Sequence, residues 1–351
     1  MTAAKAGRGG PISFERVALD DVPWTALDDT PDRTVFQTRE WLDFLVETQR
    51  VDPVVARVLR DGEGVGWFTG ATMRRRGISF LGCPLRGWTT PAMGFNLDPG
   101  VDRTSALAAL PRFAFKDLGC IHLEFADRSL TDDDAIPDGF EIGHLGGYEL
   151  ALADDDVLME AMTKNGRRDV RRSLRNGIIV EEVPATDPDF AAQYYAQVSE
   201  AFAKRDLVPT YPVERVSAVM DHLGPTGRLL LLRSYTPEGD LAATGIFPGL
   251  EGSTAEYWMG GSWRVHQAQL PNEALMWTAI RTWRDRGAVR FNFGGGGKYK
   301  AKYGGAPHRL PWVRRSRFRG LEQARKVAWS MYKRQQRRSG AASKVAPAPG
   351  G

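Results

Sequence analysis

The sequence contains little of what metal, redox and hydrolytic sites are built from. Its two cysteines, Cys83 and Cys120, stand far apart without CxxC or zinc-ligand spacing, and its five histidines form neither an HExxH nor an HxH pattern. No GxSxG elbow occurs. These absences argue against a structural zinc ion, a metallohydrolase and a serine hydrolase. We therefore expect no metal, cysteines packed in the interior of a protein from a reducing compartment, and a reaction driven by positioning and electrostatics.

Long apolar segments are also missing. No run approaches the roughly 18 residues of a transmembrane helix, and the start, MTAAKAGRGG, lacks the apolar region of a signal peptide. We therefore expect a cytoplasmic protein. A composition with 42% hydrophobic and 26% charged residues is ordinary for globular proteins, and 351 residues suffice for two domains. The net charge of +4 does not by itself indicate a nucleic-acid partner.

The most unusual stretch is 291–305, FNFGGGGKYKAKYGG. A strand-like segment is followed here by four glycines, which carry no side chain and let a ligand approach the backbone closely. Three lysines come next, which in an extended chain would share one face, with two tyrosines on the other. The residues concerned are Gly295, Gly296, Lys298, Lys300 and Lys302, with Tyr299 and Tyr303 opposite the lysines. The pattern fits an anion-binding wall, and it also fits a glycine loop with a solvated lysine edge.

Neither nucleotide-binding fingerprint matches this stretch. A P-loop needs Gly, four residues and Gly-Lys-Ser/Thr, whereas Asn292 stands at the first glycine position here and Tyr299 follows the lysine. A Rossmann motif requires a third glycine where Tyr299 stands, and it continues as a helix.

The same order of predicted elements occurs twice. The first copy comprises a helix capped by Thr38, strands at 54–60, 65–72 and 78–82, a helix at 103–118 and the strand CIHLEF. The second copy comprises strands at 228–234, 241–247 and 255–259, a helix at 271–286 and the strand AVRFNF. Gly119 and Gly287, which end the two long helices, are 168 residues apart. The sequence therefore predicts an α/β chain of two tandem units with mixed sheets.

The acidic and poorly patterned stretch 131–147 is the expected boundary between the units. The predicted division is a disordered start at 1–10, an N-terminal domain at 11–145, a C-terminal domain at 146–320, a basic helix at 321–338 and a disordered tail at 339–351.

Two segments are strongly basic. The first, KNGRRDVRRSLRNG at 164–177, is predicted to be a helix with Val170 and Leu174 as its apolar stripe. Its opposite face would carry Lys164, Arg168, Arg171, Arg172 and Arg175. Guanidinium groups pair bidentately with phosphate, so this face is a candidate phosphate-binding ridge, with a solvated basic face as the alternative.

The second basic segment, 314–338, carries ten Lys or Arg residues against the single acidic Glu322. Its cations are interleaved with Phe318, Trp329 and Tyr332. Such a composition suits an RNA backbone, an anionic membrane surface, or a terminal helix that docks its aromatic side chains on the domain.

Together these motifs resemble the FemAB-type aminoacyltransferases, which contain two fused acetyltransferase-like (GNAT) units and are related to the BioF2-like acyltransferases. The resemblance rests on RRDVRRSLRNGIIV, on EYWMGGS followed by NEALMWTAIRTWRDRGAVRFNFGG, and on YKAKYGG, which is similar to the family's F-K-x-x-F-G. In that motif Lys300 takes the place of the functional lysine. The long coiled-coil arm of many members has no counterpart here.

The resemblance implies transfer of an aminoacyl group from aminoacyl-tRNA to an amine on a peptidoglycan precursor or a natural-product peptide. The product is an amide, and no cofactor is needed beyond the tRNA co-substrate. We expect Lys300 to stabilise charge on the ester carbonyl or to hold an acceptor phosphate, with Glu256 and Tyr257 orienting or deprotonating the amine. The expected substrate-binding residues are Arg168, Arg171, Arg172, Lys298, Lys302, Gly295 and Gly296. The basic C-terminal segment would hold tRNA or contact a membrane surface.

The donor is the least determined part of this hypothesis. A GNAT that binds coenzyme A carries R/Q-x-x-G-x-G/A after its fourth strand, where amides at a helix N-terminus hold the pyrophosphate. The matching segment here, RVHQAQ at 264–269, has glutamine at both glycine positions. This argues against an ordinary coenzyme A grip. An acyl-CoA-dependent N-acyltransferase of the BioF2-like type and a non-catalytic RNA- or membrane-binding protein are the alternatives.

Overall fold

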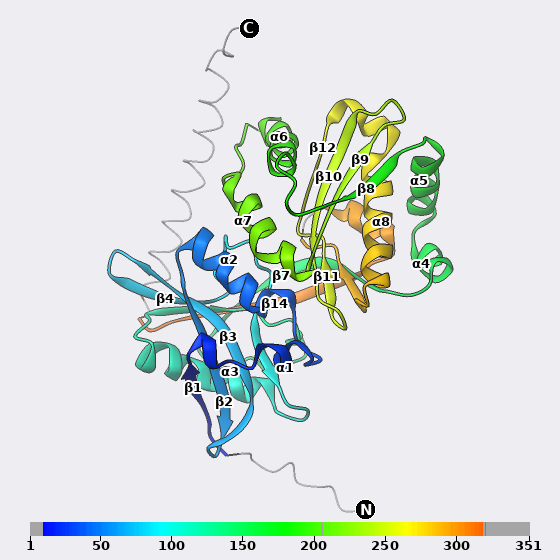
Figure 1. Ribbon diagram of the computed structural model, residues 1–351. Coiled ribbons are helices and arrows are strands. Elements are labelled where there is room, and N and C mark those ends of the chain that lie inside the picture. The colour runs from blue at the N-terminus through cyan, green and yellow to red at the C-terminus, as the bar shows by residue number, and fades with distance from the viewer. Residues whose placement is uncertain (1–9, 205, 296, 319, 321–351) are drawn as a thin grey trace, which may run out of the picture. The chain divides into compact units, whose positions relative to one another are not determined.

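The structure is a computed structural model that describes residues 10–204, 206–295, 297–318 and 320 (Figure 1). The described residues up to 145, together with Arg309–Arg317, form one compact unit, and those from 146 to 308 form most of a second. The predicted disordered start at 1–10, apart from residue 10, the basic helix at 321–338 and the tail at 339–351 lie outside the described residues. Within the described ranges, no helix is long and apolar enough to cross a membrane.

Unit 1 is built on a mixed sheet in the order β1-β2-β3-β4-β6-β14, with β5 paired to β3. Its strands are β1 (Ile12–Val17), β2 (Asp52–Arg60), β3 (Glu63–Arg75), β4 (Ile78–Cys83), β5 (Gly94–Leu97), β6 (His122–Phe125) and β14 (Ala306–Ser316). Neighbouring strands are antiparallel except β4 and β6, which run parallel. β2 and β3 form the hairpin that the sequence predicted.

The helices of unit 1 pack their apolar stripes on this sheet. They are α1 (Trp24–Asp28), α2 (Arg39–Gln49) and α3 (Arg103–Arg112), with the single turns η1 (Leu19–Asp21), η2 (Val35–Gln37) and η3 (Phe113–Asp117). As predicted, the Thr38 side chain caps α2 by accepting from the Trp41 amide, and Trp41, Phe44 and Leu45 are buried. Each of these side chains stabilises the fold by about 1.5–3 kcal/mol through burial.

Unit 2 contains an antiparallel sheet in the order β12-β10-β9-β8 and a second strand set in the order β7-β13-β11. Its strands are β7 (Glu141–Ala151), β8 (Ile179–Val183), β9 (Leu229–Tyr235), β10 (Leu241–Pro248), β11 (Thr254–Glu256), β12 (Met259–Ser262) and β13 (Arg290–Asn292). Its helices and turns are α4 (Asp155–Ala161), α5 (Lys164–Arg175), α6 (Phe190–Ala203), α7 (Glu214–Leu223), α8 (Pro271–Asp285), η4 (Gly224–Thr226), η5 (Arg264–Gln269) and η6 (Lys298–Tyr303).

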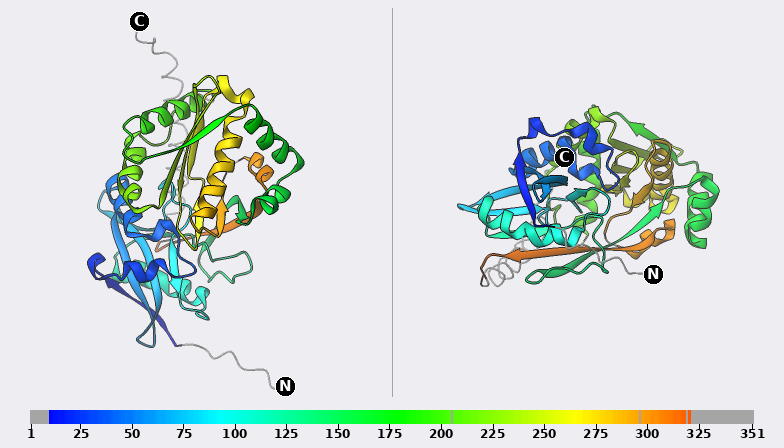
Figure 2. Two further views of the ribbon diagram at one scale, coloured as in Figure 1. Left: turned by 45° about the vertical axis from the view of Figure 1, so that its right-hand side comes forward. Right: turned by 90° about the horizontal axis from the view of Figure 1, so that it is seen from below.

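In unit 2, α6 and α7 lie on one face of the antiparallel sheet and α8 covers the other, with α5 outside α8 (Figures 1 and 2). α8 is the long helix that the sequence predicted, and it buries Leu275, Ile280 and Trp283. These side chains share one apolar core with Phe247 of β10 and Phe291 of β13. The core therefore holds β13 and the residues that follow it in a fixed position.

The two units repeat one plan, which confirms the predicted tandem α/β fold. In unit 1, β4 runs parallel to β6, whereas β5 pairs with β3 and leads to α3. In unit 2, β11 runs parallel to β13, whereas β12 pairs with β10 and leads to α8. In both units, the strand that runs parallel to the one after the long helix is thus followed by a second strand that pairs elsewhere and leads into that helix. In unit 2 these two strands, β11 and β12, are so close in sequence that they form one split strand.

Unit membership departs from the predicted division in one strand. The sequence placed 309–317 in the C-terminal domain, but β14 pairs with β6 through Val313–Ser316, so this segment belongs to unit 1. β7 begins inside the stretch 131–147 that looked unpatterned, because its residues are glycine-rich and alternate poorly.

Candidate active site

The site begins where the split strand of unit 2 changes partner. Glu256, the last residue of β11, lies opposite Asn292 of β13, whereas Met259 of β12 lies opposite Ile246 of β10. Between them, the Tyr257 amide donates to the Asn292 carbonyl oxygen at 2.8 Å, and the Trp258 amide donates to Ile246 O at 3.2 Å. Beyond this point the chain pairs with β10, as strand β12, and no longer with β13. We call the region between Tyr257 and Gly294 the strand divergence.

The backbone turns sharply after β13. Gly294 has a φ of 69°, which favours glycine, and its amide donates to the Asn292 side chain at 2.8 Å. Asn292 is buried, and the sequence analysis assigned it no role, although asparagine side chains commonly bond the backbone amide two residues on. The predicted opening at Gly295 lies directly after this turn, and Gly296 lies outside the described residues.

Lys300 is buried at the strand divergence. Only 8% of its surface is exposed, and its Nζ donates to the carbonyl oxygens of Phe293 at 2.5 Å and Gly295 at 2.7 Å. The same Nζ lies 5.0 Å from the centre of the Tyr257 ring. An ammonium has three donors, so these two carbonyls leave one for a ligand, as far as the described residues show. Burial lowers the pKa of Lys300 to about 8.

The prediction that the lysines form an extended wall is wrong. Residues Lys298–Tyr303 form a 3-10 helix, in which the Lys300 amide donates to Gly297 O at 3.2 Å. The turn ends at Gly304, whose φ is 89°. Tyr303 is buried and stacks on Phe293 with 5.6 Å between ring centres. Glycines at both ends and this stacking favour a turn over a strand.

The turn sends the three lysines in different directions. Lys298 is exposed, Lys300 is buried, and Lys302 donates to Glu273 Oε1 on α8 at 2.5 Å. In a 3-10 helix the side-chain direction repeats about every three residues, whereas in the expected strand it would repeat every two. Only Lys300 therefore reaches the strand divergence.

Of the two residues expected to handle the amine, Tyr257 lies beside Lys300. The Tyr257 ring stacks on Phe247 with 5.5 Å between centres, and burial raises the pKa of its hydroxyl well above the usual value. A phenol that stays protonated can donate a hydrogen bond, which favours an orienting role over proton abstraction. Glu256 is 4% exposed at the end of β11.

α5 is the arginine-rich helix that the sequence predicted. Thr163 caps it by accepting from the Gly166 amide at 3.1 Å, and Val170 is buried. Arg168, Arg171 and Arg172 are exposed, so they form the expected basic ridge. Leu174, which was expected in the apolar stripe, is 47% exposed instead. The helix is anchored by Gly166, Val170 and Ser173, because these residues face α8 and the lysine turn.

The basic ridge is fixed to the lysine turn through the backbone. The Thr163 amide donates to the Lys302 carbonyl oxygen at 3.1 Å, and a Cβ on Gly166 would lie 2.0 Å from that oxygen. Only glycine fits this contact. At the other end of the helix, Ser173 Oγ donates to Leu270 O at 2.6 Å and Asn176 Nδ2 donates to Gln269 O at 3.0 Å.

Arg167 is a residue whose role the sequence did not indicate. Its guanidinium donates to the carbonyl oxygens of Met159, Glu160 and Met162, at and after the end of α4, at 2.8–3.3 Å. It therefore completes the C-terminus of α4 instead of joining the exposed ridge.

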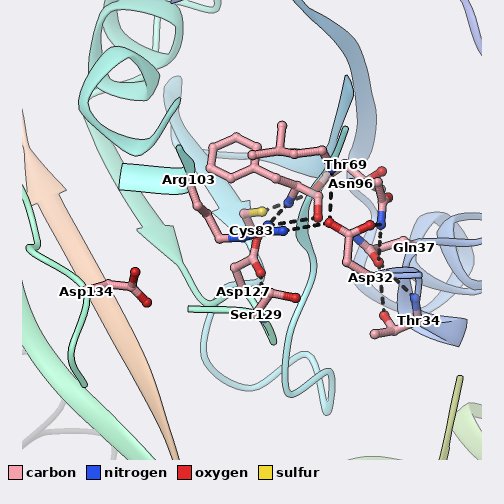
Figure 3. A network of polar contacts seen from close by, with 12 residues as sticks. Asp32, Thr34, Gln37, Thr69, Cys83, Asn96, Arg103, Asp127, Ser129 and Asp134 are labelled. Carbon is pink, nitrogen blue, oxygen red and sulfur yellow. Dashed lines mark hydrogen bonds and ion pairs between the residues drawn. The ribbon is translucent and has the colours of Figure 1, made fainter. Parts of the chain in front are cut away.

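At the corresponding place in unit 1, a carboxylate joins neighbouring elements through hydrogen bonds (Figure 3). Asp127, which follows β6, accepts from the Phe95 amide of β5 at 2.8 Å and from Arg103 of α3 at 2.6 Å. The Met93 amide also donates to Ala126 O at 2.9 Å. Arg103 pairs in addition with Asp32 at 2.6 Å. Because β5 is bonded to the end of β6 here, unit 1 has no equivalent of the strand divergence among its described residues.

The split strand, the long helix and the buried lysine of unit 2 all lie within or beside one matched segment. Residues 162–303 match the family described as acetyltransferase (GNAT) domain. These residues therefore form an acyltransferase domain of the GNAT type. Among the described residues, no group of three or more His, Cys, Asp or Glu side chains could hold a metal ion.

Solved structures show a similar fold over most of the chain. One similar structure is that of FemX, with a TM-score of 0.65, 15% identity, and coverage of 85% of this chain and 96% of that one. Another is a tandem GNAT protein from the clavulanic acid biosynthesis pathway, with a TM-score of 0.53, 14% identity, and coverage of 88% and 99%. No curated protein sequence matches the chain. The chain thus has the FemAB-like tandem GNAT fold that the resemblance predicted.

Proposed function

We propose that the protein transfers an aminoacyl group from aminoacyl-tRNA to an amine acceptor and so forms an amide bond. The observation that carries this proposal is the buried Lys300 ammonium, held by two carbonyls and the Tyr257 ring at the strand divergence. A fixed cation in a site of low polarity stabilises an oxyanion more strongly than one in water. Acyl transfer from an already activated ester needs such stabilisation more than it needs a covalent intermediate.

The reaction can be written with these residues alone. The acceptor amine attacks the ester carbonyl carbon, and negative charge develops on the carbonyl oxygen, towards which Lys300 directs its remaining N–H. The tetrahedral intermediate collapses, the C–O bond to the ribose breaks, and the ribose oxygen takes up the proton that the amine loses. Tyr257 lies next to Lys300 and, together with Glu256 at the end of β11, would orient the amine.

The donor RNA is assigned to the exposed face of α5. Arg168, Arg171 and Arg172 project from a helix whose backbone is bonded to the lysine turn, so phosphates bound there would lie at a fixed position relative to Lys300. Guanidinium groups suit phosphate because they form two parallel hydrogen bonds. The basic segment after residue 320 would add further contacts to tRNA, or peripheral contacts to a membrane surface, in the cytoplasm.

The proposed acceptor class is supported by similarity of fold. FemX and the clavulanic acid pathway protein share the fold, which supports an amine on a peptidoglycan precursor or on a natural-product peptide. An acyl-CoA-dependent N-acyltransferase is the second candidate, because residues 162–303 match the acetyltransferase (GNAT) domain.

Purified protein, radiolabelled aminoacyl-tRNA and a panel of amines provide the test. Lys300→Met keeps the length of the side chain and removes its charge. We expect kcat/KM to fall by about 100- to 1,000-fold, the size of effect seen when one oxyanion-stabilising donor is removed. Lys204→Met, at an exposed lysine directly after α6 in the same unit, is the matched control and should retain activity within about twofold. Full activity of Lys300→Met would exclude that residue from the mechanism.

A further inference from the structure

The GNAT fold implies coenzyme A as donor, so we tested whether its diphosphate fits the start of α8. Anion binding at a helix N-terminus depends on N–H groups without partners and on a local excess of positive charge. The relevant residues are those of η5, which takes the place of the glycine-containing loop, and the first turn of α8.

The amides at this helix start are largely used. In η5, His266 N–H donates to Trp263 O at 3.2 Å, and Leu270 N–H donates to Gln267 O at 3.1 Å. In α8, Pro271 has no N–H, and Glu273 N–H donates to Leu270 O at 3.2 Å. Leu270 adopts a φ of 65° without being glycine, and its carbonyl is held by Ser173 Oγ at 2.6 Å. Several donors of this loop and helix start are thus already bonded within the protein or, at Pro271, missing.

The charge at this point is already balanced from within the protein. Glu273 lies in the first turn of α8, and Oε1 of its carboxylate is 2.5 Å from Lys302 Nζ. The exposed fractions of the two side chains are 11% and 20%, so the pair is mostly shielded from solvent. Asp169 of α5 is a second carboxylate, 3.8 Å from Lys302 and 3.0 Å from Arg168.

We infer that Glu273 and Lys302 form an internal ion pair in place of a bound diphosphate, so that this end of α8 rejects coenzyme A and similar donors. The Glu273 carboxylate complements the partial positive charge of the helix start, as an anionic ligand would. Lys302 neutralises that carboxylate and is no longer available to a phosphate.

The same pair joins the lysine turn to α8. Lys302 belongs to η6, two residues after Lys300, and its carbonyl is bound by Thr163 of α5. A diphosphate that displaced Glu273 would therefore also break the contact that holds the lysine turn. Donor exclusion and the position of Lys300 depend on one interaction. The inference takes the location of the coenzyme A site from the GNAT fold and does not depend on aminoacyl-tRNA being the donor.

Isothermal titration calorimetry of the full-length protein with coenzyme A, and separately with inorganic pyrophosphate, tests the inference. For the wild type, we expect a Kd weaker than about 1 mM for both. Glu273→Gln removes the repelling charge and releases Lys302, so both ligands should bind at least about tenfold more tightly. Adding Lys302→Met to Glu273→Gln should abolish that gain. A wild type that binds coenzyme A at micromolar concentration overturns the inference, and so does a folded Glu273→Gln protein with no gain.

A second variant distinguishes the effect of Glu273 on coenzyme A affinity from the effect of the loop sequence. Gln267→Gly with Gln269→Gly restores both glycines of the coenzyme A motif and leaves Glu273 in place. We expect no gain in affinity, whereas tight coenzyme A binding by this variant would show that the glutamines determine donor choice. The proposed function is judged separately by aminoacyl-tRNA transfer. Absence of both transfer and coenzyme A binding would reject the function and leave the inference standing.

Discussion

Lys300 shows how a single buried cation can be stabilised without a carboxylate. Its described partners are two carbonyl oxygens and an aromatic ring, all of which carry partial negative charge but no net charge. These partners accept hydrogen bonds from the ammonium or lie against it, but they do not cancel its positive charge. That charge can therefore still stabilise negative charge on a substrate. The cost is a lowered pKa, because burial disfavours the charged form.

The lowered pKa of Lys300 predicts how the free energy of unfolding depends on pH. The pKa of Lys300 is about 8 in the folded protein and 10.5 for an ordinary lysine. Between these values the unfolded chain binds more protons than the native protein, so the free energy of unfolding rises with pH. Below pH 8 both states are protonated and the contribution is constant. Relative to Lys300→Met, the wild type should therefore gain stability from about pH 8 to about pH 10.

Urea unfolding of both proteins at several pH values in this window measures the difference. Other groups titrate there too, but they are common to both proteins and cancel in the comparison. A difference that stays flat, or that moves against the wild type, would mean that the Lys300 ammonium is not buried in solution.

At the scale of elements, local patterns predicted what local interactions determine. The helix that begins after Thr38, the β2–β3 hairpin and α8 carry their own caps, turns and apolar stripes, and all three were confirmed. β7 and β14 were missed, because their partners are distant in sequence and their residues alternate poorly. The lysine turn was misassigned because its conformation depends on Tyr303 stacking on Phe293, which no spacing reveals.

Part of the candidate site could be predicted for the same reason. Lys300 and the ridge on α5 were identified from motifs, whereas Asn292, Gly166 and the Glu273–Lys302 pair could not be. These residues act through contacts between elements, and one sequence does not show which elements meet. Charge alone would have assigned Lys302 to a ligand, although it is bound to Glu273.

The contact between α5 and the lysine turn predicts a large effect of a small substitution. Gly166→Ala places a methyl group 2.0 Å from the Lys302 carbonyl oxygen, so one backbone must move. We expect a loss of about 1–3 kcal/mol in the free energy of unfolding, measured by urea denaturation. Asn165→Ala, on the exposed side of the same turn, should change stability by less than about 0.5 kcal/mol. Equal effects of the two variants would contradict the close packing described.

At the scale of the whole molecule, the distribution of charge matters more than its sum. The net charge of +4 is small, yet exposed arginines concentrate on α5 next to the lysine turn and also at 74–76 in the β3–β4 hairpin of unit 1. If tRNA binding depended only on overall charge, the two clusters would contribute equally. If the site determines where tRNA binds, only the cluster on α5 would form specific phosphate contacts.

A matched pair of triple variants separates these possibilities. Arg168, Arg171 and Arg172 are changed to glutamine in one protein, and Arg74, Arg75 and Arg76 in the other, so both lose the same net charge. We expect the first variant to weaken tRNA binding by at least about tenfold and to reduce the slope of log Kd against log salt by about two to three, as each lost phosphate contact lowers the slope by about one. The second variant should keep the wild-type slope, because its arginines belong to unit 1 and not to the unit that carries Lys300. If both triple variants lost the same tRNA affinity, the arginines of α5 would attract tRNA only non-specifically. They would then not position the donor ester next to Lys300.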